Sequence, residues 1–207
     1  MNSETIAIIA VSALLLGWYV AAHMYNRRRG RRVRRWLEDG LDALDGEREA
    51  GWIGSPASGA RFNVRRASPP FRRLEITLLL ENREIPLLWL RDYLRGKRDR
   101  IIIRATLRSP RRGEVWVSSS GQSDLQGASW TWREGPHGLK IAFRGHNGRQ
   151  LVTALSPWLE AYGTHLDRFH WRKQDPHINL QLRIAGHLEI EAEAFLTDLS
   201  TALEADS

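Results

Sequence analysis

The sequence predicts an α+β protein: an N-terminal transmembrane helix, then a cytoplasmic domain with an antiparallel sheet of about eight strands built from two ββαββ units. Helices are expected on one face of this sheet, with one more at the C-terminus. Residues 5–25 form an uncharged run, and short segments of alternating apolar and polar residues follow in two groups, each enclosing a stretch of helical periodicity. The expected boundaries are 1–26 for the membrane anchor, 27–60 for a basic collar, juxtamembrane helix and linker, and 61–207 for the soluble domain.

The uncharged run is long enough to cross a bilayer. Its 21 residues, TIAIIAVSALLLGWYVAAHMY, would reach about 32 Å as a helix, and a hydrocarbon core is about 30 Å thick. A cleaved signal peptide would have Lys or Arg before the run and small residues after it, but residues 1–4 hold neither and the run ends in His23-Met24-Tyr25. A buried core helix would be shorter or amphipathic. We therefore interpret the run as a single transmembrane helix.

A basic collar follows the run and sets the expected orientation. Lys and Arg near a span stay on the cytoplasmic side, so the short N-terminal head is expected outside and residues 26–207 in the cytoplasm, at the inner membrane of a bacterium. Trp18, Tyr19 and Tyr25 lie toward the cytoplasmic end, where aromatic rings settle at the headgroups. The collar is either a topology signal alone or also a site for anionic lipid headgroups. Its members are Arg27, Arg28, Arg29, Arg31, Arg32, Arg34 and Arg35.

The rest of the chain suits one domain with a real core. A hydrophobic fraction of 42% and nine tryptophans argue against disorder. The absence of cysteine excludes disulfides and thiol chemistry and fits a cytosolic domain. The net charge of +7 is uneven: the collar carries +7, residues 36–60 carry −5, residues 61–112 carry +10, and residues 113–207 carry −4.

Two features are expected between the anchor and the domain. Apolar residues recur at helical spacing between Val33 and Leu44, which predicts a second helix over 27–45. It could continue the membrane helix, with Gly30 as a possible break. The small, turn-rich segment 51–60, GWIGSPASGA, is interpreted as a linker.

The first unit covers residues 61–118. Apolar residues at every second position, such as Leu74 and Leu78, predict strands with one buried face. Pro86 suits the first turn of a helix and Gly96 suits its end. The expected elements are strands at 61–65, 73–80, 100–107 and 114–118, and a helix at 85–95 with an apolar stripe of Ile85, Leu88, Trp89 and Tyr93.

The second unit, residues 129–185, repeats this order of elements, and such repetition sets an architecture. Leu74-Glu75-Ile76 aligns with Leu139-Lys140-Ile141, so we predict two units joined edge to edge in one sheet. In topology alone this resembles the saddle of TATA-binding proteins, and no function is inferred from that resemblance. The expected elements are strands at 129–133, 139–143, 165–172 and 177–184, a helix at 149–162 and a C-terminal helix at 188–204.

The sequence holds no recognisable motif for catalysis, cofactor binding or metal binding. It lacks a GxxxxGK phosphate loop, a GxGxxG loop after a strand, HExxH and GxSxG. His165 and His170 are five apart in a predicted strand and so face opposite ways. Glu189, Glu191 and Glu193 fit the preference for acids at a helix N-terminus. We therefore predict no catalytic residue, no cofactor and no metal.

Residues 61–112 could form a basic face. If their strands are neighbours, their outward arginines could hold anionic lipid headgroups or a nucleic-acid backbone, or could be a solvated face paired with the acidic segment 36–50. Trp116, Trp130 and Trp132 either stack on bases or an apolar partner or pack in the core. The possible basic face consists of Arg61, Arg65, Arg73, Arg104, Arg108, Arg111 and Arg112.

Three functions remain. The first is a non-enzymatic, single-pass membrane protein whose cytoplasmic domain acts as a binding module at the membrane surface, for a protein partner or for the bilayer itself. The second is a membrane-tethered nucleic-acid binder that uses 61–112 and binds with a steep salt dependence. The third is an enzyme with a dispersed site, which no motif supports. The expected partners are the lipid bilayer with its anionic headgroups and an unknown protein, with nucleic acid less favoured.

Overall fold

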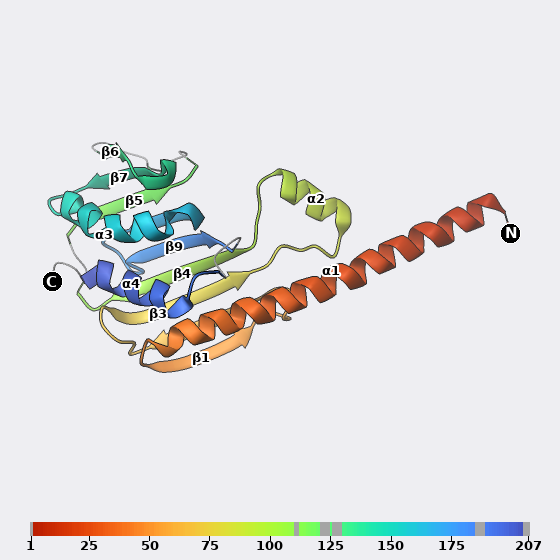
Figure 1. The fold of residues 1–207 in the computed structure, drawn as a ribbon, viewed down its shortest axis with the longest axis horizontal. Coiled ribbons are helices and arrows are strands. Elements are labelled where there is room, and N and C mark those ends of the chain that lie inside the picture. The colour runs from red at the N-terminus through yellow and green to blue at the C-terminus, as the bar shows by residue number, and fades with distance from the viewer. Residues whose placement is uncertain (1, 110–111, 121–124, 126–129, 185–188, 205–207) are drawn as a thin grey trace.

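A long N-terminal helix and a two-layer α+β domain make up the protein (Figure 1). The computed structural model describes residues 2–109, 112–120, 125, 130–184 and 189–204. The domain contains a nine-stranded sheet in the order β1-β2-β3-β4-β9-β8-β5-β7-β6, in which all neighbouring strands are antiparallel. The predicted α+β class with a long apolar N-terminal helix and a C-terminal helix is therefore confirmed.

The bounds of the elements follow the predicted periodicities closely in most of the domain. The strands are β1 (Glu47–Trp52), β2 (Gly59–Arg65), β3 (Phe71–Leu79), β4 (Arg100–Leu107), β5 (Glu114–Ser118), β6 (Thr131–Glu134), β7 (Lys140–Arg144), β8 (Leu166–Trp171) and β9 (Ile178–Arg183). The α-helices are α1 (Ser3–Asp42), α2 (Pro86–Leu94), α3 (Gly148–Tyr162) and α4 (Ala192–Glu204).

Helix α1 runs without a break from the uncharged segment into the domain, where it ends at Asp42. The break considered at Gly30 is absent. Gly30 instead allows a close approach, because a Cβ at this position would lie 2.0 Å from the carbonyl oxygen of Pro56. Gly40 has the same role against Ala192 of α4, at 2.7 Å. The predicted membrane helix and the predicted juxtamembrane helix are thus one rigid element.

The C-terminal half of α1 belongs to the core of the domain. Val33, Leu37 and Leu41 recur on one face and are each at most 1% exposed, and Leu44, just beyond the end of the helix, is 3% exposed. The indole of Trp36 donates a hydrogen bond to the carbonyl oxygen of Ile190, at 2.7 Å. The domain therefore depends on residues of α1 for its packing.

The prediction of a linker at 51–60 is wrong. This segment contains the end of β1, a tight turn and the start of β2, and the hairpin pairs Trp52 with Ala60. The turn requires glycine at Gly59, where φ is +157° and a Cβ would lie 2.2 Å from the carbonyl oxygen of Leu78. The guanidinium of Arg34 stacks on the ring of Trp52, 4.6 Å from its centroid. Small residues here make a close turn rather than a flexible connection.

The predicted pair of ββαββ units is also wrong, and with it the resemblance to a two-repeat saddle. Both segments contain the expected order of elements along the chain, but their strands pair differently. β3 lies directly beside β4, whereas β5 separates β7 from β8, the corresponding strands of the second segment. β4 pairs with β9 and not with β5. Alternation specifies that a segment forms a strand, but the choice of neighbour is made by contacts distant in sequence.

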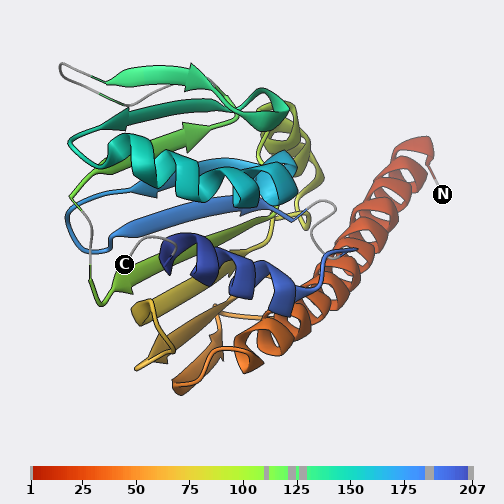
Figure 2. The same cartoon turned by 60° about the vertical axis from the view of Figure 1, so that its left-hand side comes forward.

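Among the described residues, helices cover one face of the sheet. α3, α4 and the C-terminal half of α1 lie on this face (Figure 2), and the apolar positions of the strands point toward them. Phe71, Ile103 and Leu180 are among the side chains that this layer buries completely or almost completely. The opposite face, the open face of the sheet, carries the polar positions of the strands; its arginines on β2, β3 and β4 are exposed, whereas Trp116 and Ala142 toward its other end are buried.

We expect Leu37→Ala to destabilise the domain by about 3 kcal/mol, because Leu37 is 1% exposed and a core Leu→Ala change leaves a cavity. Leu16→Ala, in the same helix at a position that is 65% exposed, is the matched control. Chemical unfolding of the full chain in detergent, followed by tryptophan fluorescence, measures both. Equal stability of the two variants would contradict a shared core.

Candidate binding site between the long helix and α2

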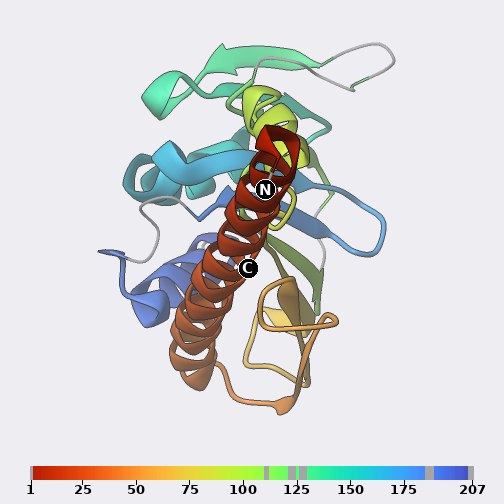
Figure 3. The same ribbon diagram turned by 90° about the vertical axis from the view of Figure 1, so that its right-hand side faces the viewer.

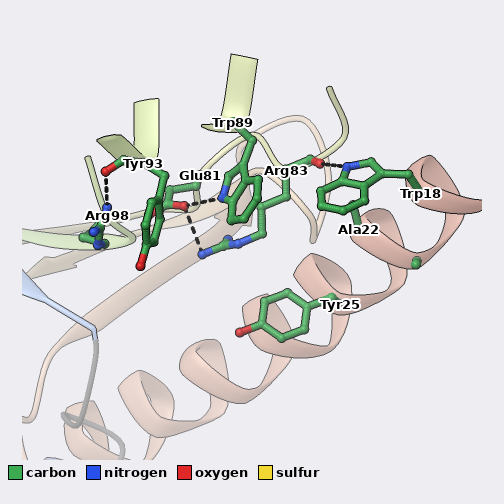
Figure 4. A pocket seen from close by; sticks show the side chains of 9 residues that line it. Trp18, Ala22, Tyr25, Glu81, Arg83, Trp89, Tyr93 and Arg98 are labelled. Carbon is green, nitrogen blue, oxygen red and sulfur yellow. Dashed lines mark hydrogen bonds and ion pairs between the residues drawn. The ribbon is translucent and has the colours of Figure 1, made fainter. Parts of the chain in front are cut away.

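A cavity of about 550 Å³ lies where α1 meets α2 and the loop that precedes it. Figure 4 shows aromatic rings from both helices around this space, with one carboxylate and two guanidinium groups at its wall. The combination of an apolar body and few polar groups is typical of a small-molecule site. The lining residues are Trp18, Ala21, Ala22, Tyr25, Glu81, Arg83, Trp89, Tyr93 and Arg98.

The α1 wall comes from residues that recur on one side of the helix. The indole of Trp18 donates a hydrogen bond to the carbonyl oxygen of Arg83, at 2.8 Å, and its ring lies 5.6 Å from that of Trp89. Buried Asn26, two turns on, donates to the carbonyl oxygen of Glu81, at 2.8 Å, and accepts from Arg83. The loop backbone is thereby fixed to α1 at two points, of which Figure 4 shows the one made by Trp18.

The carboxylate of Asp99, just before β4, holds the site together. It is 3% exposed and accepts hydrogen bonds from Arg29 Nε at 2.5 Å, from Arg83 Nη1 and Nη2 at 2.9 and 3.1 Å, and from the backbone N–H of Glu81 at 2.8 Å. Burial on its own would lower the pKa of Arg83, but the hydrogen bond and charge of Asp99, with the charge of Glu81, raise it. Arg83 therefore stays charged in this site.

Glu81 lines the cavity, and one of its two carboxylate oxygens is buried without a partner in the described part of the chain. Its Oε2 accepts from the indole of Trp89 at 3.1 Å and lies 3.3 Å from Arg83 Nη2. The Glu81 side chain is only 7% exposed. Its Oε1 is buried and has no hydrogen-bond partner among the described residues. A buried acceptor without a partner is costly.

Helix α2 differs from its prediction. It was expected to bury a stripe containing Ile85, Leu88, Trp89 and Tyr93, but no residue of α2 is buried and the helix lies beside α1 instead of on the sheet. Trp89 and Tyr93 line the cavity, whereas Ile85 is 52% exposed. The stripe could be read from the sequence, but the surface that it meets could not.

The arginine collar divides into two groups. Arg29 binds Asp99, and Arg34 binds Glu38 and stacks on Trp52, so both have structural roles. The other five are exposed on the sides of α1 that do not face the domain. They are Arg27, Arg28, Arg31, Arg32 and Arg35.

The structure places most of the possible basic face on the open side of the sheet. Arg61, Arg65, Arg73 and Arg104 are exposed on β2, β3 and β4, with Arg65 paired to Arg73 in register. Arg61 lies 3.8 Å from Glu75. Arg108 instead donates to the carbonyl oxygens of Ala67 and Phe71, and so does not join this face. Arg112 is exposed beyond β4, and Arg111 lies outside the described residues.

Residues of the second half extend this face, which the sequence analysis missed. A hollow of about 240 Å³ joins Arg73 and Arg104 to Arg172, together with the acidic side chains of Glu75 and Asp175. Arg172 belongs to the segment of net negative charge, and only the pairing of β4 with β9 brings it close. The face therefore carries mixed charge, with arginine in excess around this hollow.

The three tryptophans considered for stacking, Trp116, Trp130 and Trp132, divide between packing and exposure. Trp116 is 2% exposed and meets Trp132 edge-on, with ring centroids 5.9 Å apart. Trp132 is 47% exposed on the edge strand β6. The guanidinium of Arg144 lies 4.6 Å from the ring of Trp130. Trp116 is thus packed in the interior, and Trp132 is the exposed ring at the β6 end of the open face.

Chemistry that needs clustered ligands finds no support in the described part of the chain, where no three His, Asp or Glu side chains gather as a metal site. Comparison with protein-family models gives no match, and comparison with curated proteins gives no significant match. The geometry of the cavity and of the open face therefore carries the functional argument.

We expect Asp99→Ala to destabilise the full chain by about 3 kcal/mol, because it leaves Arg29 and Arg83 without their buried carboxylate. Asp92→Ala removes a carboxylate that pairs with Arg91 and Lys97 at the surface, and a smaller loss is expected. Denaturant unfolding in detergent measures both. A loss for Asp99→Ala no larger than that for Asp92→Ala would show that the buried cluster does not hold the site.

The open face contains one group that makes stability depend on pH. Burial lowers the pKa of His170 below 6.5, nearby Arg172 lowers it further, and Glu114 opposes this. The unfolded state then binds the proton more readily, so stability falls as the pH drops below about 6.5 toward the folded-state pKa. We expect His170→Gln to reduce this pH dependence. Melting temperatures across that range test it, and an unchanged slope would contradict it.

Proposed function

We propose that this protein is a non-enzymatic, single-pass bacterial membrane protein whose α+β domain is held against the cytoplasmic membrane surface and acts there as a binding module. The observation that carries the proposal is the continuity of α1. Its first half is apolar and exposed, its second half is part of the domain core, and no break separates them. The binding site is the cavity between α1 and α2.

Membrane insertion is supported by the exposure of the apolar half of α1. In the described residues, α1 is the one helix that is long and apolar enough to cross a membrane. Ile8, Leu14 and Leu16 are 67%, 69% and 65% exposed, which would be unfavourable in water. Cleavage as a signal peptide would cut a helix whose residues from Trp18 onward bind the domain.

The orientation is supported by the five exposed arginines of the collar. They follow the apolar half of α1 and surround the helix where it enters the domain, and arginine at such a position stays in the cytoplasm. At this position they also meet the anionic headgroups of the inner leaflet. The domain and the cavity then lie on the cytoplasmic side.

The position of the cavity supports an amphiphilic ligand. Trp18 and Tyr25 belong to the end of the apolar half of α1 and line the cavity, so its opening lies at the depth of the membrane interface. Its aromatic walls suit an apolar chain, and the guanidinium groups of Arg83 and Arg98 at its wall suit a polar headgroup. A lipid or an apolar segment of a protein partner approaches from this side.

Cysteine accessibility tests the proposed topology, since the chain has no cysteine of its own. We expect an impermeant maleimide to label Ser3→Cys on intact cells. Thr153→Cys, exposed on α3, should be labelled only after the inner membrane is permeabilised. Labelling of Thr153→Cys on intact cells would contradict the proposal, and labelling of both variants in a soluble fraction would exclude anchoring.

Nucleic-acid binding is a second candidate, favoured by the arginines that surround the hollow on the open face. We expect a binder of this kind to lose about two units of salt slope in the double variant Arg73→Ala/Arg104→Ala, because each phosphate contact contributes about one. Arg149→Ala, on the other layer of the domain, is the control. Gel shifts with the full chain in nanodiscs of neutral lipid measure the slope, and no shift at low salt would exclude this candidate.

A further inference from the structure

Helix α2 carries an apolar stripe that faces away from the rest of the protein. Leu87, Leu90 and Leu94 recur at the spacing of one helical face and are 81%, 47% and 75% exposed. Arg91 shares this face and is also exposed. A stripe of leucines with one long basic side chain is typical of helices that lie in a membrane interface, where the arginine reaches up to the headgroups.

The length of α1 places α2 at the depth of the membrane. In the described residues, the first hydrogen bond between α1 and the domain is made by Trp18, so residues 3–17 project beyond it. These reach about 22 Å, which is short of a hydrocarbon core of about 30 Å. A complete span must therefore include residues from Trp18 onward, which lie beside the loop that precedes α2.

The charged groups at this depth are paired, as a low-dielectric environment requires. Nδ1 of His23 and Oε1 of Glu84 are 2.8 Å apart. Arg83 is held by Asp99. The basic residues that are exposed near α2, such as Arg95 and Lys97, lie at its C-terminal end and beyond it. The loop can thus approach the bilayer without exposing an unpaired charge to lipid.

We propose that α2 is a second membrane contact, which lies in the plane of the bilayer interface with Leu87, Leu90 and Leu94 inserted among the lipids. This inference rests on the proposed function, because it requires α1 to cross the membrane. The bilayer is the occupant because the stripe continues a lipid-facing surface. The rings of Trp18 and Trp89 join the two helices, and Figure 3 shows α2 beside α1, at the end of the domain from which the span projects.

Depth-dependent quenching tests the proposal in the full chain. Single cysteines replace Leu87, Leu94, Leu16 and Thr153, and each carries an environment-sensitive fluorophore. The variants are placed in nanodiscs of phosphatidylethanolamine and phosphatidylglycerol, with or without bromine on the acyl chains near the headgroup, and are also titrated with aqueous iodide. Tryptophan emission of the unlabelled variants confirms that each has folded.

We expect brominated lipid to quench most of the emission at Leu87→Cys, Leu94→Cys and Leu16→Cys, and iodide to quench only Thr153→Cys. If Leu16→Cys is quenched by lipid but the α2 probes behave like Thr153→Cys, the second contact is wrong and the anchor stands. If Leu16→Cys is not quenched by lipid, the proposed function fails as well. Shielding of the α2 probes from both quenchers would mean that protein covers the stripe, which also overturns the proposal.

Discussion

The buried carboxylate of Asp99 is the interaction on which the junction of α1, α2 and the sheet depends. It joins α1 through Arg29, the loop before α2 through Arg83, and the start of β4 through its own backbone. A carboxylate that is 3% exposed costs free energy unless it is fully paired. Four hydrogen bonds from N–H groups of three residues meet that requirement, and they leave the loop only one position relative to α1. The shape of the cavity follows from this position.

The continuity of α1 leaves no boundary between its apolar half and the domain. The helix that projects from the domain is also the helix that supplies Val33, Leu37 and Leu41 to its core. A chain cut at residue 52 would lose these side chains, each worth about 2 kcal/mol of burial, from a fold whose total stability is of the order of 10 kcal/mol. The rest of the domain therefore cannot be separated from α1 without loss of part of its core.

Local periodicity predicted the elements well, but it could not predict how they assemble. The segment 100–107 coincides with β4, and 149–162 differs from α3 by one residue, because alternation and helical spacing are local properties. The strand order, and the pair of Arg29 with Asp99 across 70 positions, arise from contacts distant in sequence. The cavity was missed for this reason, and α2 was assigned to the core because an apolar stripe looks the same whether protein or lipid covers it.

The unbroken helix also couples the domain mechanically to the apolar half of α1. A bilayer thinner than the span is accommodated by helix tilt, and α1 has no proline or flexible segment that would absorb such a tilt before the domain. The close contacts of Gly30 with Pro56 and of Gly40 with Ala192 fix the angle between helix and sheet. In a membrane, the open face of the sheet would therefore rotate with α1 as one rigid body. The bilayer thickness would then set the direction in which its arginines point.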